Sequence, residues 1–235
     1  MKYYTIYGER CSGTNYLENL MKLNFNIEYN NSNGNKHFFG HIDNFTHSED
    51  TLFICIVRNL PDWVNSLYRE LYHLPLKYKT GLSDVQKIDE FLNQQFFSIN
   101  DFQHNYKSWS KEIMDDRNIY TGNRYKNIYE LRHTKLKYMI EDLPKKVHNC
   151  ILIKYDDLLD DFDNVMFKLK ATGLIVKPEV VFPLNTFLYK KDPNRVFVKN
   201  AYKQIISPAM IVNNPNLIKT YEEHLGFMKS PPKFT

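Results

Sequence analysis

Cysteine is scarce in this chain, and long apolar runs are absent from it. The 235 residues include three cysteines, Cys11, Cys55 and Cys150, an odd number that does not build a disulfide framework. Their positions also lack the spacing of a Cys/His metal site, so we expect no metal site and a reducing compartment, the cytoplasm. No apolar run approaches the roughly 20 residues that cross a bilayer, so we expect a soluble protein without a membrane span.

Glycine is also scarce, at 8 of 235 residues, yet two glycines lie at the spacing G-x-x-x-x-G. Gly8 and Gly13 follow the run 3–7, whose β-branched and aromatic residues suit a buried strand. Apolar residues at helical spacing come next: Leu17, Leu20 and Met21. A strand, a glycine loop and a helix N-terminus direct backbone N–H groups at an anion, so the pattern predicts a phosphate-binding loop. The alternative is that both are ordinary turn glycines.

The loop lacks the lysine of enzymes that hydrolyse nucleoside triphosphates. In that class Lys and then Ser or Thr follow the second glycine, whereas Thr14 and Asn15 follow Gly13 here. We therefore expect the loop to bind a phosphate ester other than a hydrolysable triphosphate. A cysteine phosphatase is excluded as well, because its C-x5-R loop needs an arginine six positions after Cys11, where this chain has Leu17.

A second informative stretch covers residues 51–66. Residues 51–57 form a continuous apolar run, which is typical of a strand buried on both faces of a parallel sheet. Arg58 follows at the carboxyl end, where ligands bind in open α/β sheets. Pro61 suits the first turn of a helix that carries Ser66. A guanidinium and a hydroxyl placed in this way can bind a second phosphate. The alternative is a surface arginine and a helical serine without a ligand.

The length of the chain suits one α/β domain with a sizeable core. We expect a single domain over residues 1–235, with helices at about 87–114 and 124–141 and an irregular C-terminal segment at about 178–235. A break of the first helix near residues 98–100 is the alternative to one continuous helix. The formal net charge is +4, which is enough for an anionic ligand but too small for a nucleic-acid-binding protein.

Three motifs in order resemble the sulfotransferases that use 3′-phosphoadenosine 5′-phosphosulfate (PAPS). Gly8 to Leu17 resembles their 5′-phosphosulfate loop in the branch that reads GERxSGTNYL, and Arg58 with Ser66 resembles their 3′-phosphate site. Residues 151–159 resemble the strand and Y-[ED]-D-L turn that follow in these enzymes. The resemblance implies a P-loop NTPase-like three-layer fold, with a mostly parallel sheet and helices on both faces. It also implies PAPS as cofactor, its product adenosine 3′,5′-bisphosphate (PAP), and metal-independent transfer.

The resemblance implies a role for each matching residue. The nucleotide would be bound by Arg10, Cys11, Ser12, Gly13, Thr14, Asn15, Tyr16, Arg58, Ser66 and Tyr155. In this set the loop holds the 5′-phosphosulfate, Tyr16 lies near the adenine, and Arg58 and Ser66 bind the 3′-phosphate. The chain departs from the family at Cys11, where many members have Lys or Arg to stabilise the bridging oxygen. Arg10 is the nearest cation and the natural candidate for that role.

The general base is expected on the segment that begins at Lys36, where similar sulfotransferases place theirs. His37 is the first candidate and His41 the second. The alternative is that a histidine beside Phe38 and Phe39 only packs.

A basic run follows further on, in which Arg132 and Lys135 lie three residues apart and share one helical face. We predict that these two side chains bind the acceptor substrate. The alternative is a solvated helix face.

Together these features predict an enzyme that transfers a sulfuryl group from PAPS to an acceptor hydroxyl or amine. The acceptor is a small molecule, a glycan or a peptide, and no nucleic-acid partner is expected. Two alternatives stay open. One is a nucleotide or nucleoside kinase with a metal-binding aspartate in residues 151–157, and the other is a nucleotide-binding module with weak turnover.

Overall fold

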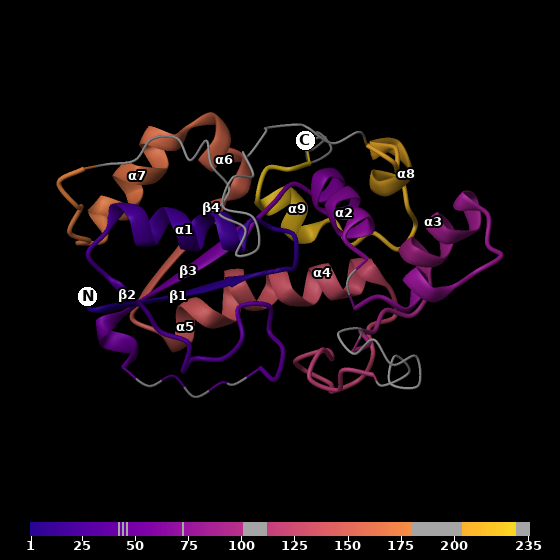
Figure 1. The fold of residues 1–235 in the computed structure, drawn as a ribbon, viewed down its shortest axis with the longest axis horizontal. Coiled ribbons are helices and arrows are strands. Elements are labelled where there is room, and N and C mark those ends of the chain that lie inside the picture. The colour runs from indigo at the N-terminus through magenta and orange to yellow at the C-terminus, as the bar shows by residue number, and fades with distance from the viewer. Residues whose placement is uncertain are drawn as a thin grey trace, which may run out of the picture. The chain divides into compact units, whose positions relative to one another are not determined.

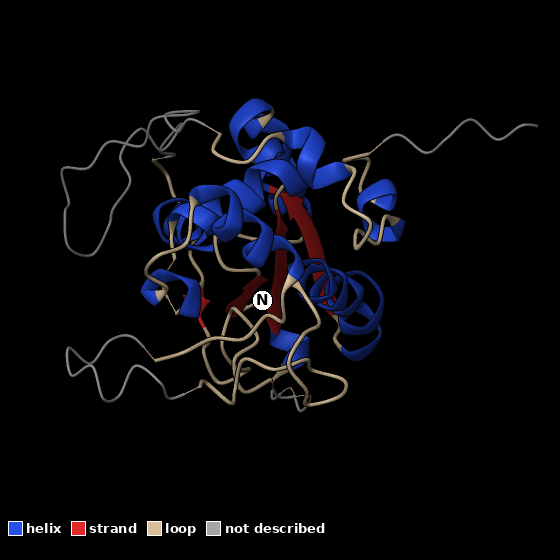
Figure 2. Cartoon of the chain, turned by 90° about the vertical axis from the view of Figure 1, so that its right-hand side faces the viewer, coloured by secondary structure: helices blue, strands red, loops and turns tan. Residues whose placement is uncertain are grey.

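The computed structural model describes residues 1–41, 43, 45, 47–71, 73–100, 112–179 and 204–228 (Figure 1). Within these residues four strands form one parallel sheet in the order β2-β1-β3-β4. The strands, red in Figure 2, are β1 (Tyr3–Gly8), β2 (Glu28–Tyr29), β3 (Thr51–Val57) and β4 (Asn149–Lys154). The predicted α/β class with a mostly parallel sheet is therefore confirmed.

The two inner strands are buried on both faces. All residues of β3 are buried, and in β1 only Tyr3 is partly exposed. Runs of this kind are the pattern of strands that are covered on both sides in a parallel sheet. Gly8 pairs with Ile56, and Ile56 pairs with Ile153, so β1, β3 and β4 end at the same edge of the sheet.

Three helices pack together on one face of this sheet. They are α1 (Thr14–Asn24), α6 (Tyr155–Asp160) and α7 (Phe162–Ala171), which lie close together in Figure 1. Their apolar side chains form a core with alternate strand residues, namely Tyr4, Ile6, Leu52, Ile54 and Ile56. Toward the opposite face, the Cys55 thiol approaches the carbonyl oxygen of Met139 at 3.9 Å. Met139 lies in the π-helical turn Tyr138–Asp142, and α5 (Leu143–Lys146) follows it.

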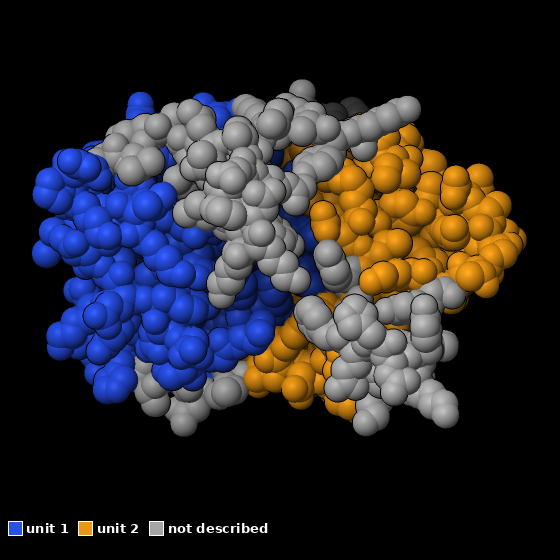
Figure 3. Space-filling view, in the orientation of Figure 1, with its two compact units in different colours: residues 1–37, 42–58, 139–203 blue, residues 38–41, 59–138, 204–235 orange. Residues whose placement is uncertain are grey.

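The chain divides into two compact units, which have different colours in Figure 3. The first unit comprises residues 1–37, 42–58 and 139–203 and contains the sheet. The second comprises residues 38–41, 59–138 and 204–235. The single sulfotransferase-like domain stays a prediction.

The described part of the second unit is mainly helical. Its α-helices are α2 (Leu60–Arg69), α3 (Asp84–Asn93), α4 (Ile128–Lys137), α8 (Pro208–Val212) and α9 (Thr220–His224). Short 3₁₀ turns occur at Pro75–Tyr78 in this unit and at Ser48–Asp50 in the first. Because α8 and α9 lie within residues 204–228, the predicted irregular segment is wrong there, and residues 180–203 and 229–235 lie outside the described residues. Among the described residues, no helix combines the length and apolar character needed to cross a membrane.

The two predicted long helices differ from those observed. The predicted helix 87–114 is wrong in extent, because α3 ends at Asn93 and Phe96 then forms an isolated bridge with Tyr125. A capping box between Ser83 and Gln86 sets the start of α3. The helix predicted at 124–141 begins at Ile128 as α4, because the Asn127 side chain accepts hydrogen bonds from the backbone N–H groups of the first turn.

Arg132 and Lys135 of α4 are buried, which corrects the prediction that they bind the acceptor. Arg132 is 2% exposed and forms a bidentate ion pair with Glu222 of α9, with Nε–Oε1 and Nη2–Oε2 distances of 2.5 and 3.0 Å. Lys135 is 1% exposed and lies 3.5 Å from the carboxylate of Asp116, which also accepts a hydrogen bond from Ser98. Each cation is neutralised inside the second unit, so these residues stabilise the packing of α4 instead of forming a solvated face.

The Arg132–Glu222 pair provides a test of this packing. Replacing Glu222→Gln leaves a buried guanidinium without its counter-charge, and we expect the free energy of unfolding to fall by about 3–5 kcal/mol. Urea unfolding followed by circular dichroism measures this change. Lys2→Met, which removes an exposed ion pair with Asp50, is the control and should cost less than about 1 kcal/mol. Equal stability of the two variants would contradict the proposed role of the buried pair.

Candidate functional site

The first glycine of the loop and two predicted site residues lie where neighbouring strands end. Gly8 is the last residue of β1, Arg58 follows β3 directly, and Tyr155 follows β4. Since these strands are parallel neighbours, all three residues lie at the carboxyl edge of the sheet. The order β2-β1-β3-β4 also reverses direction between β1 and β3, and such a switch point is where open α/β sheets bind ligands.

Both glycines of the loop are required by close contacts. A Cβ atom on Gly8 would lie 2.6 Å from the Ser12 hydroxyl and 2.8 Å from the carbonyl oxygen of Ile56. A Cβ atom on Gly13 would lie 2.3 Å from the ring of Tyr155, and Gly13 has a φ of +99°. These distances leave no room for a side chain. Both positions therefore require glycine for the packing of the loop, whichever role the loop has.

The loop is held in shape by its own hydrogen bonds. The backbone N–H and the hydroxyl of Ser12 both donate to the carbonyl oxygen of Glu9, at 3.2 and 2.8 Å. Cys11 has a φ of +64°, which places a non-glycine residue in the left-handed region. Ser12 and Glu9 are fully buried, whereas Arg10 and Cys11 are partly exposed. The Ser12 hydroxyl thus holds the loop, and the backbone is what the loop presents to a ligand.

The start of α1 is suited to an anion. Gly13 is its N-cap residue and makes no side-chain capping bond, and no acidic residue lies in the first turn. The first N–H groups of a helix have no intrahelical partner, and they carry the positive end of the helix dipole. Thr14 is buried and Asn15 is exposed, so of these two side chains Asn15 is the one accessible to a ligand.

Arg58 contacts the loop directly. Its Nη1 atom donates to the carbonyl oxygen of Cys11 at 3.3 Å, and its guanidinium carbon lies 4.9 Å from the centre of the Tyr155 ring. Tyr16 meets Tyr155 edge to face, with 6.0 Å between ring centres. Tyr16 and Tyr155 are only 3% and 6% exposed, and both rings belong to the apolar core on which the loop packs. This burial places Tyr16 in the core and does not support its predicted position beside the adenine.

His37 lies at the end of β1. Its Nδ1 atom is 2.9 Å from the carbonyl oxygen of Gly8. A carbonyl oxygen only accepts, so Nδ1 carries a proton and donates it, and Nε2 keeps a lone pair in the neutral ring. The ring is half-buried and lies beside the loop.

The other predicted site residues belong to the second unit. Ser66 is half-buried on α2, next to Asn65, whose side-chain oxygen accepts hydrogen bonds from the N–H groups of Ile205 and Ile206. His41 packs edge to face on the ring of Tyr138, with 4.4 Å between ring centres. The alternative to a base in this segment is a histidine that only packs against aromatic rings. That description fits His41 better than His37.

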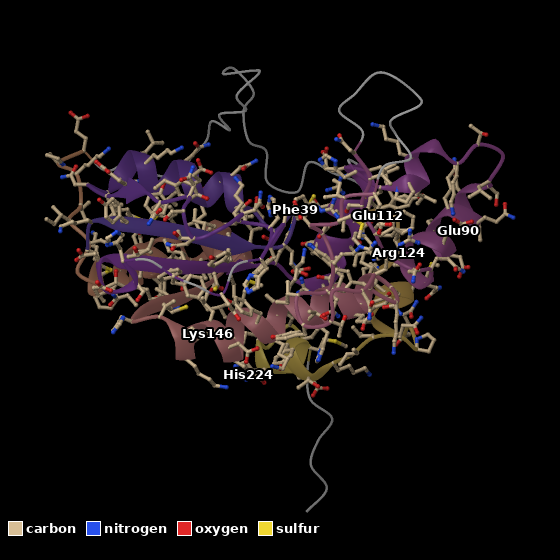
Figure 4. All side chains as sticks on the ribbon, turned by 90° about the horizontal axis from the view of Figure 1, so that it is seen from below. Phe39, Glu90, Glu112, Arg124, Lys146 and His224 are labelled. Atoms are coloured by element: carbon tan, nitrogen blue, oxygen red, sulfur yellow. The ribbon has the colours of Figure 1, made fainter. Side chains whose placement is uncertain are left out.

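Arg124, a basic residue that precedes α4, is paired with a carboxylate as well. Figure 4 shows Arg124 beside Glu112, and the two side chains form a bidentate ion pair with a closest distance of 2.6 Å. Glu112 also binds Arg117 at 2.9 Å. Together with the buried pairs of Arg132 and Lys135, these bonds show that Arg124, Arg132 and Lys135 are each paired with a carboxylate of the second unit.

Comparison with models of known protein families gives no match for this chain, and comparison with curated protein sequences gives none. The function is therefore inferred from the residues and geometry of the site.

Gly13 and Gly34 form a matched pair for testing the loop. Their φ angles are +99° and +98°, but nothing lies within 4 Å of a Cβ atom on Gly34, so only Gly13→Ala also collides with Tyr155. We expect Gly34→Ala to cost about 1 kcal/mol of stability from backbone strain. Gly13→Ala should cost about 1–3 kcal/mol more from overpacking. Thermal unfolding of both variants measures the difference, and the added substitution Tyr155→Leu should restore part of it. Equal melting temperatures of the two alanine variants would show that the Tyr155 ring does not determine the conformation of the loop at Gly13.

Proposed function

We propose that this protein binds PAPS at the loop 8–14 and transfers its sulfuryl group to an acceptor hydroxyl or amine. The observation that carries the proposal is a glycine loop that leads into the N-terminus of α1 and contains no lysine, with Arg58 bonded to it from the end of the next strand. A loop of this kind suits a 5′-phosphosulfate, whose transferred group bears less charge than the γ-phosphate of ATP. A P-loop-like three-layer fold is part of the same proposal and is supported by the parallel sheet with helices packed on it.

The proposed binding roles follow from the geometry of the first unit. The first N–H groups of α1 and the Asn15 side chain bind the 5′-phosphosulfate. Arg58 binds the 3′-phosphate through its guanidinium group, which is already oriented by the Tyr155 ring. Ser66 remains a sequence prediction for the same phosphate.

The proposed reaction moves one proton and one sulfuryl group. The acceptor oxygen or nitrogen attacks sulfur while Nε2 of His37 takes its proton, and the bond between sulfur and the bridging oxygen breaks. PAP then leaves with an additional negative charge on its 5′-phosphate. The N-terminus of α1 and Arg10 stabilise this charge, and loss of one such donor typically lowers the rate about 10²–10³-fold.

The first test is nucleotide selectivity. Calorimetry should give a dissociation constant for PAP that is about 10–100 times lower than those for 5′-ADP and ATP, because each charge-assisted hydrogen bond to the 3′-phosphate contributes about 1.5–3 kcal/mol. Arg58→Ala should remove most of this preference. Binding in EDTA should be unchanged. Tight, Mg²⁺-dependent binding of ATP would instead favour the kinase alternative, with Asp156 or Asp157 as metal ligand.

The second test concerns the base. His37→Ala should lower kcat for sulfuryl transfer about 10²–10⁴-fold, the typical contribution of a general base, and should leave PAP affinity nearly unchanged. His37→Asn can keep a hydrogen bond to Gly8 but has no base, so it should be equally slow. His224→Ala, at an exposed position of α9, is the control. Full activity of His37→Asn would show that position 37 only holds the loop.

A further inference from the structure

We infer that Lys36 provides a second cation, besides Arg10, for the 5′-phosphate of the nucleotide, next to a loop that lacks a lysine of its own. This inference rests on the proposed function and adds to it a residue that the sequence motifs do not indicate. Four observations support it: where the backbone of Lys36 is fixed, where its ammonium group lies, how its charge is balanced, and how accessible it is.

The backbone of Lys36 is bonded to Gly8, the first residue of the loop. Its carbonyl oxygen accepts a hydrogen bond from the N–H of Gly8 at 2.9 Å, while the carbonyl oxygen of Gly8 accepts from His37. Both polar backbone groups of the first loop glycine are therefore bonded to the segment 36–37. This segment cannot shift without disturbing the end of β1.

The ammonium group of Lys36 lies at the other end of the loop. Its Nζ atom donates to the side-chain oxygen of Asn15 at 2.5 Å and lies 3.1 Å from Oε2 of Glu18. Asn15 is the second residue of α1, so the positive charge is placed at the first turn of the helix. Lys36 thus contacts the loop at its start through the backbone and at its end through the side chain.

The charge of Lys36 is only partly neutralised. Glu18 is shared by two lysines, since its Oε1 atom accepts from Lys22 at 2.5 Å. Burial disfavours ionisation of Glu18, but the hydrogen bond from Lys22 and the charge of Lys36 outweigh it, so the pKa of Glu18 is lowered and the group is a carboxylate. One carboxylate against two ammonium groups leaves one positive charge beside a helix N-terminus that has no acidic residue in its first turn.

The ammonium group of Lys36 is accessible to a ligand while its ion pair with Glu18 stays formed. Its side chain is 22% exposed, and Asn15, its partner nearest to the loop, is an exposed neutral amide. A phosphate oxygen is a stronger acceptor for an ammonium group than an amide oxygen, because the hydrogen bond is charge-assisted on both sides. A bound 5′-phosphate would therefore replace Asn15 as a partner of Nζ and keep the ion pair with Glu18.

The test compares two ligands that differ only in the 5′-phosphate, namely PAP and adenosine 3′-monophosphate. We expect Lys36→Met to raise the dissociation constant of PAP about 10–100-fold and that of adenosine 3′-monophosphate less than about 2-fold. Lys2→Met is the control, because it removes an exposed lysine that pairs with Asp50, and it should change neither constant by more than about 2-fold. Lys36→Arg should recover most of the PAP affinity.

Each other outcome has a distinct meaning. If Lys36→Met weakens both ligands equally, the residue only supports the loop and the inference is wrong. If neither dissociation constant changes, Lys36 does not contact the 5′-phosphate and the inference is wrong. If the wild-type protein does not bind PAP at all, the proposed function fails, and this inference fails with it.

A second measurement needs no variant and covers the case in which Lys36→Met does not fold. Acetylation of the wild-type protein, read by mass spectrometry, should be slowed at Lys36 by PAP but not by adenosine 3′-monophosphate. Acetylation of Lys22 should be unaffected by both. Equal protection of Lys36 by the two nucleotides would overturn the inference.

Discussion

The contact between Gly13 and the ring of Tyr155 is the constraint on which the site depends. The ring occupies the space that any side chain at position 13 would need, so the end of β4 determines how the loop after β1 can turn. The same ring lies under the guanidinium of Arg58, which in turn bonds to Cys11 of the loop. Three strand ends are therefore joined through one aromatic side chain, whose packing fixes the backbone of the loop. Preformed backbone donors cost little reorganisation on binding.

The two units use charge in different ways. In the second unit each buried cation has its own carboxylate, and the bidentate pair of Arg132 with Glu222 is an example. Such pairs add little net stability, but they are costly to break, so they fix which helices pack together. Beside the loop of the first unit, Glu18 faces both Lys22 and Lys36, and the excess positive charge is left at the place where an anion is expected.

Much of the fold could be predicted from the sequence, because inner strands of a parallel sheet are continuous apolar runs. The runs 3–7 and 51–57 correspond closely to β1 and β3, and residues 151–154 fall within β4. The helix predicted at 87–114 failed, since its end depends on bridges to residues further along the chain, such as Phe96 with Tyr125. Arg132 and Lys135 do share a helix face, but their spacing does not tell whether that face meets solvent or a buried carboxylate.

The site was predictable to the extent that it is local in sequence. Glycine spacing indicated the loop, the end of the apolar run 51–57 indicated Arg58, and the resemblance at residues 151–159 indicated Tyr155. Lys36 was missed as a site residue because its signal is a set of bonds to Gly8, Asn15 and Glu18, which lie 18 to 28 positions away. A loop that carries its own lysine holds charge and backbone donors on one segment. Here the loop provides the backbone N–H donors, and the positive charges come from other segments. Lys36 is bonded to Gly8 and Asn15, and Arg58 is bonded to Cys11. A lysine that is placed by bonds to distant residues is not part of a short motif. The motif therefore predicts the backbone shape of this site but not where its positive charges lie.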